Sequence, residues 1–145
     1  MIDLNDVRAR VHGLLGFEGQ PLFLSVEDSV SGAEAMEQFT ATPPAAFVTI
    51  AGETAAPSKH MGRHEQTVLA TVSILWALAA ERADEDRADP MEEAKRQVIL
   101  GLAGWRAAGA MDAFNYSSFS VRFIGEGLMW GEALFRARYF LSIAP

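Results

Sequence analysis

Two histidines and two basic side chains lie close together in the segment SKHMGRHE, residues 58–65. His60 and His64 are four residues apart, which is the spacing of two metal ligands on one helical turn. Lys59 and Arg63 add two positive charges in the middle of an acidic chain. Three kinds of site could use these side chains: a metal centre, a catalytic corner, or a loop that contacts a partner.

A metal centre or a catalytic histidine pair needs more than this segment offers. Gly62 lies between the histidines and Pro57 precedes them, so we expect a loop and not the helical turn that would hold the pair. The third histidine, His12, is distant in the chain, and there is no cysteine. We therefore expect no metal at His60 and His64, and we keep a histidine-dependent metalloenzyme only as a comparison.

The other motifs also fail to indicate an enzyme. The chain has no G-x-S-x-G turn for a serine nucleophile, and no G-x-G-x-x-G or Walker-type lysine loop for a phosphate-bearing cofactor. The acidic run ERADEDRADPMEE lacks the alternating acids and the central glycine of a calcium loop. The segment SVSGAE, with Ser31 before Gly32, is better explained by a helix cap at Ser29 or Ser31 than by a nucleophile. We expect a protein that is not an enzyme and that has no cofactor.

The charge of the chain is acidic and unevenly placed. The net charge is −7, and residues 18–53 carry six acidic residues and no basic ones, whereas residues 122–138 carry three arginines and two glutamates. Two lysines in the whole chain are too few for clustered phosphate contacts, which disfavours tight nucleic-acid binding. A surface with unlike charges on different sides suits contacts between unlike faces of identical subunits.

Length and composition predict one domain made in the cytoplasm. A chain of 145 residues has the usual size of a single domain, so we expect one domain spanning residues 1–145. The first residues lack the apolar core of a signal peptide, and the longest apolar run, residues 68–80, is too short to span a membrane. Without cysteine, the expectation is a soluble protein of a reducing compartment with no membrane partner.

Hydrophobic periodicity predicts two main helices and a short one. Asp3 caps the first helix and Gly16 ends it, while Asp89 and Pro90 begin the second. A short acidic helix or loop is expected at residues 31–39. The apolar stripes are formed by Leu4, Val7, Val11, Leu14 and Leu15 in the first helix, and by Met91, Ala94, Val98, Leu102 and Trp105 in the second.

Alternating apolar residues predict the strands. They are expected at residues 21–28, 46–51, 65–79, 119–123 and 135–143. The run 65–79 also fits a helix, but its β-branched residues favour a strand. Gly52 is expected to end the second strand, and residues 125–127 to form a turn or a bulge. Because the strands follow one another in pairs, we predict an α+β fold, with a mostly antiparallel sheet of about four to five strands packed against two main helices.

The three tryptophans are expected to anchor the core and not to form a ligand box. Aromatic residues on strand faces and helix stripes usually serve this purpose, as Trp76 and Trp105 would. Trp130 differs because it follows GEGLM, where the alternating pattern is interrupted. Two roles fit it equally: a plug at the edge of the core, or a contact in a subunit interface.

The order of elements and several segments resemble a known family. The strand PPAAFVTIAGE, the polar loop after it, the run RHEQTVLATVSILWA and the helix DPMEEAKRQVILGLAGW are followed by FIGEGLMWGEALFRARYFLS. That ending, a glycine-rich turn, a tryptophan and an alternating strand, carries most of the likeness. Over nearly its whole length the chain resembles phage tail terminator proteins and the related small minor tail proteins of long-tailed phages (the lambda gpU-like fold).

The resemblance implies a structural part of a virion. Such proteins form a ring, commonly hexameric, at the head-proximal end of the tail tube, which ends tube polymerisation and presents a surface for head joining. The implied partners are other copies of the chain, the tail-tube protein and a head-completion or connector protein, with DNA only passing through the lumen. The implied location is the virion tail, assembled in the host cytoplasm.

Other functions stay open on the sequence. The chain could be a head–tail connector or another minor tail protein, or, in a different class, a small-molecule-binding or regulatory α+β domain. Genes for tube, tape-measure or head-completion proteins beside this one would favour the tail. In every structural reading we expect the basic and aromatic side chains to make the contacts. The candidate subunit or partner contacts are Lys59, His60, Arg63, His64, Arg122, Trp130, Arg136 and Arg138.

Overall fold

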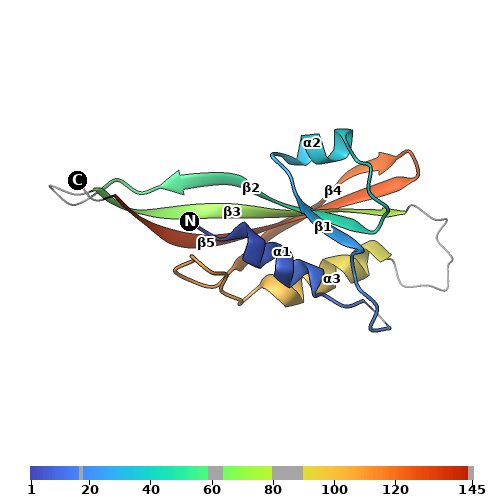
Figure 1. Ribbon diagram of the computed structural model, residues 1–145, viewed down its shortest axis with the longest axis horizontal. Coiled ribbons are helices and arrows are strands. Elements are labelled where there is room, and N and C mark those ends of the chain that lie inside the picture. Colours follow the sequence, from blue (N-terminus) through green and yellow to red (C-terminus); the bar gives the residue numbers. More distant parts are fainter. Residues whose placement is uncertain (17, 59–63, 80–89, 144–145) are drawn as a thin grey trace.

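One five-stranded sheet organises the fold (Figure 1). The computed structural model describes residues 1–16, 18–58, 64–79 and 90–143. Its elements are α1 (Leu4–His12), β1 (Ser25–Asp28), α2 (Gly32–Glu37), β2 (Ala45–Ala55), β3 (His64–Ala79), α3 (Pro90–Leu102), β4 (Asn115–Gly125) and β5 (Leu128–Ile143). The strand order is β1-β2-β3-β5-β4, and only β1 and β2 run parallel. The expected α+β class with a mostly antiparallel sheet is confirmed.

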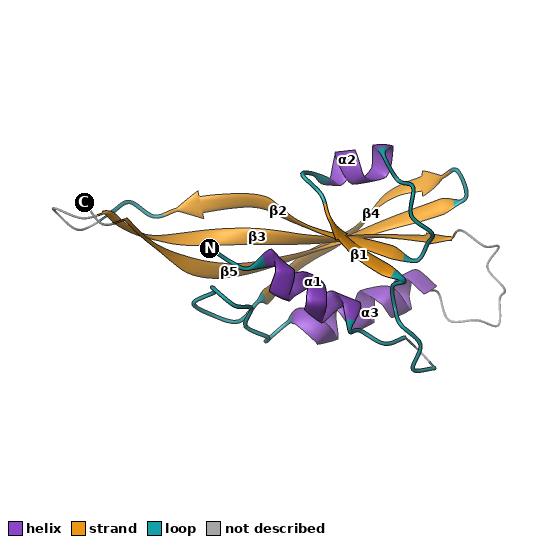
Figure 2. Cartoon of the chain, in the orientation of Figure 1, coloured by secondary structure: helices purple, strands orange, loops and turns teal. Residues whose placement is uncertain are grey.

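The helices cover the two faces of the sheet unequally. Figure 2 shows α1 and α3 on one face and the short α2 on the other. We call these the two-helix face and the α2 face. The sheet extends beyond all three helices at the end where the C-terminus lies.

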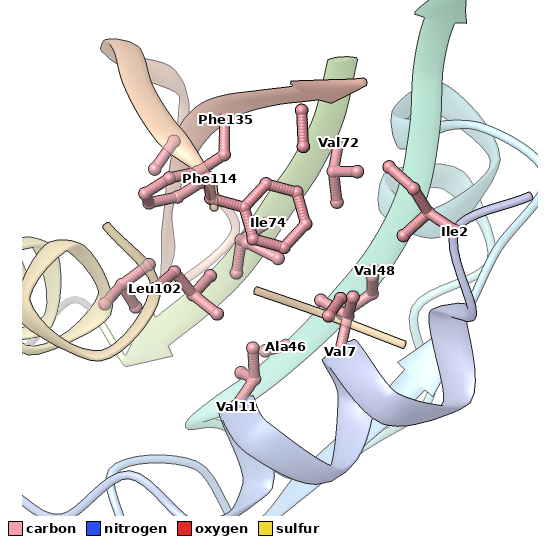
Figure 3. Close-up of a cluster of buried hydrophobic side chains, with 14 of the residues drawn as sticks. Ile2, Val7, Val11, Ala46, Val48, Val72, Ile74, Leu102, Phe114 and Phe135 are labelled. Atoms are coloured by element: carbon pink, nitrogen blue, oxygen red, sulfur yellow. The ribbon is translucent and has the colours of Figure 1, made fainter. Parts of the chain in front are cut away.

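The main core fills the space between the two-helix face and α1 with α3. Alternate residues of each strand point to this side, so valine, isoleucine and aromatic side chains of three strands meet the apolar stripes of the helices. Figure 3 shows this cluster, which contains Ile2, Val7, Val11, Ala46, Val48, Val72, Ile74, Leu102, Phe114 and Phe135. The predicted buried stripe of α3 is confirmed at Met91, Ala94, Val98 and Leu102.

A smaller cluster lies under α2 on the opposite face. It consists of Ala35, Phe47, Leu75, Ala77 and Trp130, with Met36 and Phe39 packed against it. Ser31 begins α2, and its hydroxyl accepts a hydrogen bond from the main-chain N–H of Glu34 at 3.1 Å. This confirms Ser31 as a helix cap.

The long strands β3 and β5 pair over all 16 of their residues, from His64 opposite Ile143 to Ala79 opposite Leu128. The expected strand over residues 65–79 is therefore confirmed. Together with the end of β2 these strands form a three-stranded extension that none of the described helices covers (Figure 1). We name residues 53–55 of β2, 64–70 of β3 and 137–143 of β5 the distal ribbon.

The structure corrects the predicted ends of both main helices. α1 ends at His12, before Gly16, because Gly13 caps it through its N–H to Ala9 O. Leu15 therefore leaves the helical stripe and is 54% exposed. α3 ends at Leu102, so Trp105 packs from the following loop, where the guanidinium of Arg10 lies 5.2 Å from its ring centroid. Asp89 lies outside the described residues.

Three predicted strands also differ. β1 is shorter than predicted, and Phe23 before it is fully buried while Leu24 is 58% exposed. β2 does not stop at Gly52: the register shifts between Ile50 and Gly52, Ala51 is left without a partner residue on β3, and pairing continues from Gly52 to Ala55. The consecutive pairs are not all antiparallel, since β1 returns to β2 through α2.

β5 begins at Leu128 and not at residue 135. Gly131 lies within this strand. The position requires glycine, because a Cβ there would lie 2.6 Å from Met91 Sδ and 3.0 Å from Trp76 Cε2. The glycine is thus a point of close approach to the core and not a break in the strand. Trp130 is a residue of this strand.

Candidate interaction surfaces

The predicted basic loop adjoins the distal ribbon. Lys59, His60 and Arg63 lie outside the described residues, so their placement as contacts stays a prediction. His64 is described: it begins β3, is exposed, and its Nε2 hydrogen-bonds with Oε1 of Gln66. Of the four predicted contacts in this loop, the structure places one, at the tip of the ribbon.

Arg138 is held on the outer side of β5 by Asp112. The guanidinium Nε of Arg138 donates to Asp112 Oδ2 at 2.7 Å, and its main-chain N–H donates to Oδ1 at 2.8 Å. The main-chain N–H first, and then the guanidinium, hold the pKa of Asp112 below its ordinary value. Met111 N–H donates to Arg138 O at 2.7 Å, so the loop before β4 is fixed to β5 at this residue.

A second polar contact crosses the distal ribbon on the two-helix face. Tyr139 of β5 donates its hydroxyl to Oε2 of Glu53 on β2 at 3.0 Å, across β3. Burial, and then the hydrogen bond to the Glu53 carboxylate, raise the pKa of Tyr139. This contact joins the two outer strands of the ribbon and fixes their side chains relative to each other.

Glu132 contacts two polar side chains on the α2 face. Its Oε2 accepts from the hydroxyl of Ser73 at 2.7 Å, and its Oε1 lies 3.7 Å from Nε of Arg122. Arg136 is exposed and has no ion pair within the described part of the chain. Of the three predicted arginine contacts, Arg122 and Arg138 are therefore engaged within the chain, and Arg136 is available.

Trp130 is 2% exposed and belongs to the cluster under α2. Its ring lies 5.1 Å from that of Phe39 in an edge-on arrangement, and 6.2 Å from that of Phe47. It therefore fills the core edge, one of the two roles considered for it. An open hollow of ≈ 400 Å³ lies beside it between α2 and the β4–β5 turn. Its lining includes Met36, Glu37, Phe39, Glu126, Leu128 and Trp130.

Sequence reasoning missed the apolar surface of the distal ribbon. Phe140 is 50% exposed and Ile143 is 55% exposed, and Leu69 on β3 is also exposed. Phe140 alternates with Tyr139 along β5, so it lies on the α2 face, beyond the reach of α2. The sequence did contain a signal for this surface: the alternation along residues 135–143 puts Phe140 on the same strand face as Arg136 and Arg138.

Two further observations concern metal ligands and membrane spans. In the described part of the chain, no group of three or more histidine, aspartate or glutamate side chains is arranged to hold a metal ion. None of the helices described is long and apolar enough to cross a membrane. The described residues instead offer candidate contact surfaces: a ribbon with exposed apolar side chains, a polar sheet face and exposed Arg136.

Comparison with known proteins relates the chain to one family. The family model described as phage tail terminator protein matches residues 21–145. Among curated proteins, nothing matches. A chain in a solved structure titled "Virion of native gene transfer agent (GTA) particle" is 14% identical, with a TM-score of 0.46, and the match covers 81% of this chain and 80% of that one.

The class of protein is therefore a structural protein of a phage tail. The family match includes all five strands together with α2 and α3, and it omits α1. The chain belongs to the phage tail terminator protein family.

Proposed function

We propose that copies of this chain form a ring, commonly a hexamer in such proteins, that caps the head-proximal end of a tail tube. The ring ends tube polymerisation and presents the surface to which a head-completion or connector protein binds. The observation that carries this proposal is the family match over residues 21–145.

The distribution of charge supports contacts between unlike sides of identical copies. β1, at one edge of the sheet, carries exposed Glu27 and Asp28, and α2 beside it carries exposed Glu37. The opposite side, formed by β4 and β5, carries Arg122 and Arg136. In a ring every copy meets its neighbour through two different patches, and an acidic side facing a basic side suits such a contact.

The net charge also suits a ring that surrounds DNA. At −7 per copy, the assembled ring is strongly negative and repels the phosphate backbone. DNA would therefore pass through the lumen without being held by it. The tail-tube protein and the head-completion protein would bind the two ends of the ring.

The first experiment asks where the chain assembles. Purified chain is mixed with preformed tail tubes and studied by native mass spectrometry and electron microscopy. We expect a closed ring of identical copies, bound at one end of each tube. Capped tails should then join DNA-filled heads, and uncapped tubes should not.

The alternatives predict other results. A head–tail connector would bind the portal side of the head and leave tube ends bare. A small-molecule-binding domain would show a thermal shift with metabolites and no ring. A chain that stays monomeric, alone and with tubes, contradicts the proposed ring.

A further inference from the structure

The outer edge of β5 is bare along the distal ribbon. The N–H and C=O of Arg138 point away from β3, because they bond Asp112 and Met111. Strand residues two apart point their main-chain groups the same way, so those of Phe140 and Ser142 also point outward. β4 pairs with β5 only as far as Arg136, and no described residue bonds the main chain of Phe140 or Ser142 on that side.

The outer edge of β2 is bare at the same end. The N–H of Ala56 donates to Thr67 O at 2.9 Å, so Ala56 and Thr54 point their main-chain groups towards β3. Glu53 and Ala55 therefore point theirs outward. β1 pairs with β2 only as far as Val48, and in the described chain nothing bonds the main chain of Glu53 or Ala55 from outside.

None of Glu53, Ala55, Phe140 and Ser142 is a proline or a lysine, and no described residue bonds their outward main-chain groups. Exposed edges are normally blocked by proline, by lysine or by a covering loop. β5 ends in Tyr-Phe-Leu-Ser-Ile, residues 139–143, which favours strand pairing. Half of the Phe140 side chain is exposed there. An edge of this kind is expected to be covered in the assembled protein.

The two bare edges lie on opposite sides of one ribbon, since β3 separates β2 from β5. We propose that the β5 edge at Phe140 and Ser142 pairs with the β2 edge at Glu53 and Ala55 of the next copy. The junction is heterologous, so each copy uses both edges once and a closed ring leaves none bare. This inference rests on the proposed ring and specifies how its copies are joined.

The topology sets the direction of the new pair. β2 and β5 both run antiparallel to β3, so they run parallel to each other within one copy. Copies related by rotation about a ring axis keep that direction, and β5 therefore meets the neighbouring β2 as a parallel pair. A two-fold dimer through two β5 edges would instead be antiparallel, and it would leave both β2 edges bare.

Charge at the base of the ribbon fits the same neighbour. Exposed Glu27 on β1 and exposed Arg136 on β5 lie on the α2 face, on opposite sides of the sheet. When one copy is placed beside the next, the acidic side of one faces the available arginine of the other.

Proline substitutions test the two edges separately. Proline removes an outward N–H but is tolerated on an edge strand, because the pairing with the inner strand does not use that group. Ala55→Pro blocks the β2 edge and Ser142→Pro blocks the β5 edge, each with little loss of side chain. Val121→Pro is the matched control, since Val121 is exposed on β4, at the edge outside the ribbon.

Assembly is measured by analytical ultracentrifugation and native mass spectrometry, with the fold checked by circular dichroism. We expect each ribbon variant to weaken ring assembly at least about tenfold, with the fold retained, and Val121→Pro to assemble like the native chain. Rings that form normally in both ribbon variants, or that fail only with Val121→Pro, would overturn the edge pairing.

Cross-linking gives a readout that does not depend on stability. The chain has no cysteine, so the introduced thiols are the only ones that can be cross-linked. Thr54 and Ser142 both lie on the α2 face, at opposite sides of the ribbon. With Thr54→Cys and Ser142→Cys in one chain, a short bismaleimide should produce a ladder that ends at the ring size.

The single-cysteine variants separate the alternatives. Neither Thr54→Cys nor Ser142→Cys alone should cross-link, because each thiol would face an unmodified strand. A dimer from Ser142→Cys alone would show two β5 edges meeting, which contradicts the proposal. Native rings without a ladder in the double variant would overturn the edge pairing alone, and the absence of native rings on tubes or in solution would overturn the ring as well.

Discussion

Asp112 holds Arg138 through two hydrogen bonds, to its guanidinium at 2.7 Å and to its main-chain N–H at 2.8 Å. The pairing of β4 with β5 begins at Arg136. The next residue of β5 with an outward main-chain N–H is Arg138, and Asp112 accepts the hydrogen bond that a paired strand would otherwise accept. Beyond this contact no described residue pairs with the outer edge of β5. Asp112 thus marks the boundary between the part of the sheet completed within the chain and the distal ribbon.

The first prediction concerns this contact. Asp112→Ala should lower the free energy of unfolding by about 1 kcal/mol, since the lost bonds are charge-assisted but one third of the side chain is exposed. Asp112→Asn should lose less, because its amide oxygen still accepts from the main-chain N–H. Urea denaturation of the three proteins measures the difference, and equal stabilities would contradict a structural role for Asp112.

The same contact predicts a dependence on pH. Because the pKa of Asp112 is lowered in the folded chain, the stabilising contribution is complete above the ordinary value of 3.8. It is lost as the pH falls from that value through the lowered pKa. The difference in stability between the native chain and Asp112→Ala should therefore be constant near neutral pH and shrink in this acidic window. A difference that grows on acidification would show the opposite sign.

Gly131 provides a test of the core. Gly131→Ala would place a Cβ 2.6 Å from Met91 Sδ and 3.0 Å from the Trp76 ring, so overpacking should cost about 1–3 kcal/mol. Gly52→Ala is the matched control, because no atom lies within 4 Å of a Cβ there. Thermal unfolding of both variants measures the effect. Equal behaviour would mean that Met91 moves aside without cost.

The raised pKa of Tyr139 predicts a loss of stability at alkaline pH. Burial and the Glu53 carboxylate raise its pKa above the ordinary value of 10.0, so its contribution to stability is complete below that value and is lost as the pH rises through the raised pKa. The chain has two tyrosines, and Tyr139→Phe should remove the one that ionises late, as seen in tyrosinate absorbance. Glu53→Gln should lower the pKa of Tyr139 only in part, because burial remains. Unchanged late ionisation in Tyr139→Phe would disprove the assignment.

Local patterns predicted most of the fold. The β-branched run at residues 65–79 and the stripe of α3 identify a strand and a helix, because both repeat over many residues. The predicted end of β2 at Gly52 was wrong, because Ala51 serves a register shift and pairing continues. The predicted start of β5 at residue 135 was wrong too, because Gly131 serves a close packing contact within the strand. Such roles depend on neighbours from other strands, and one chain segment does not reveal them.

The candidate site was predicted less completely, for a related reason. The uneven placement of charge predicted Arg122, Arg136 and Arg138 as contacts, but Arg138 is engaged by Asp112 from a separate loop, a contact that sequence distance conceals. The bare edges of β2 and β5 follow from where β1 and β4 stop pairing. That depends on strand order, which alternation alone does not determine.

Tube growth tests the central claim most directly. Tail-tube protein is polymerised with and without this chain, and tube lengths are followed by electron microscopy while more tube protein is added. The proposed function predicts that tubes ending in a ring of this chain stop growing, whereas untreated tubes lengthen. Tubes that keep growing at the same rate, with no ring at their ends, would contradict it.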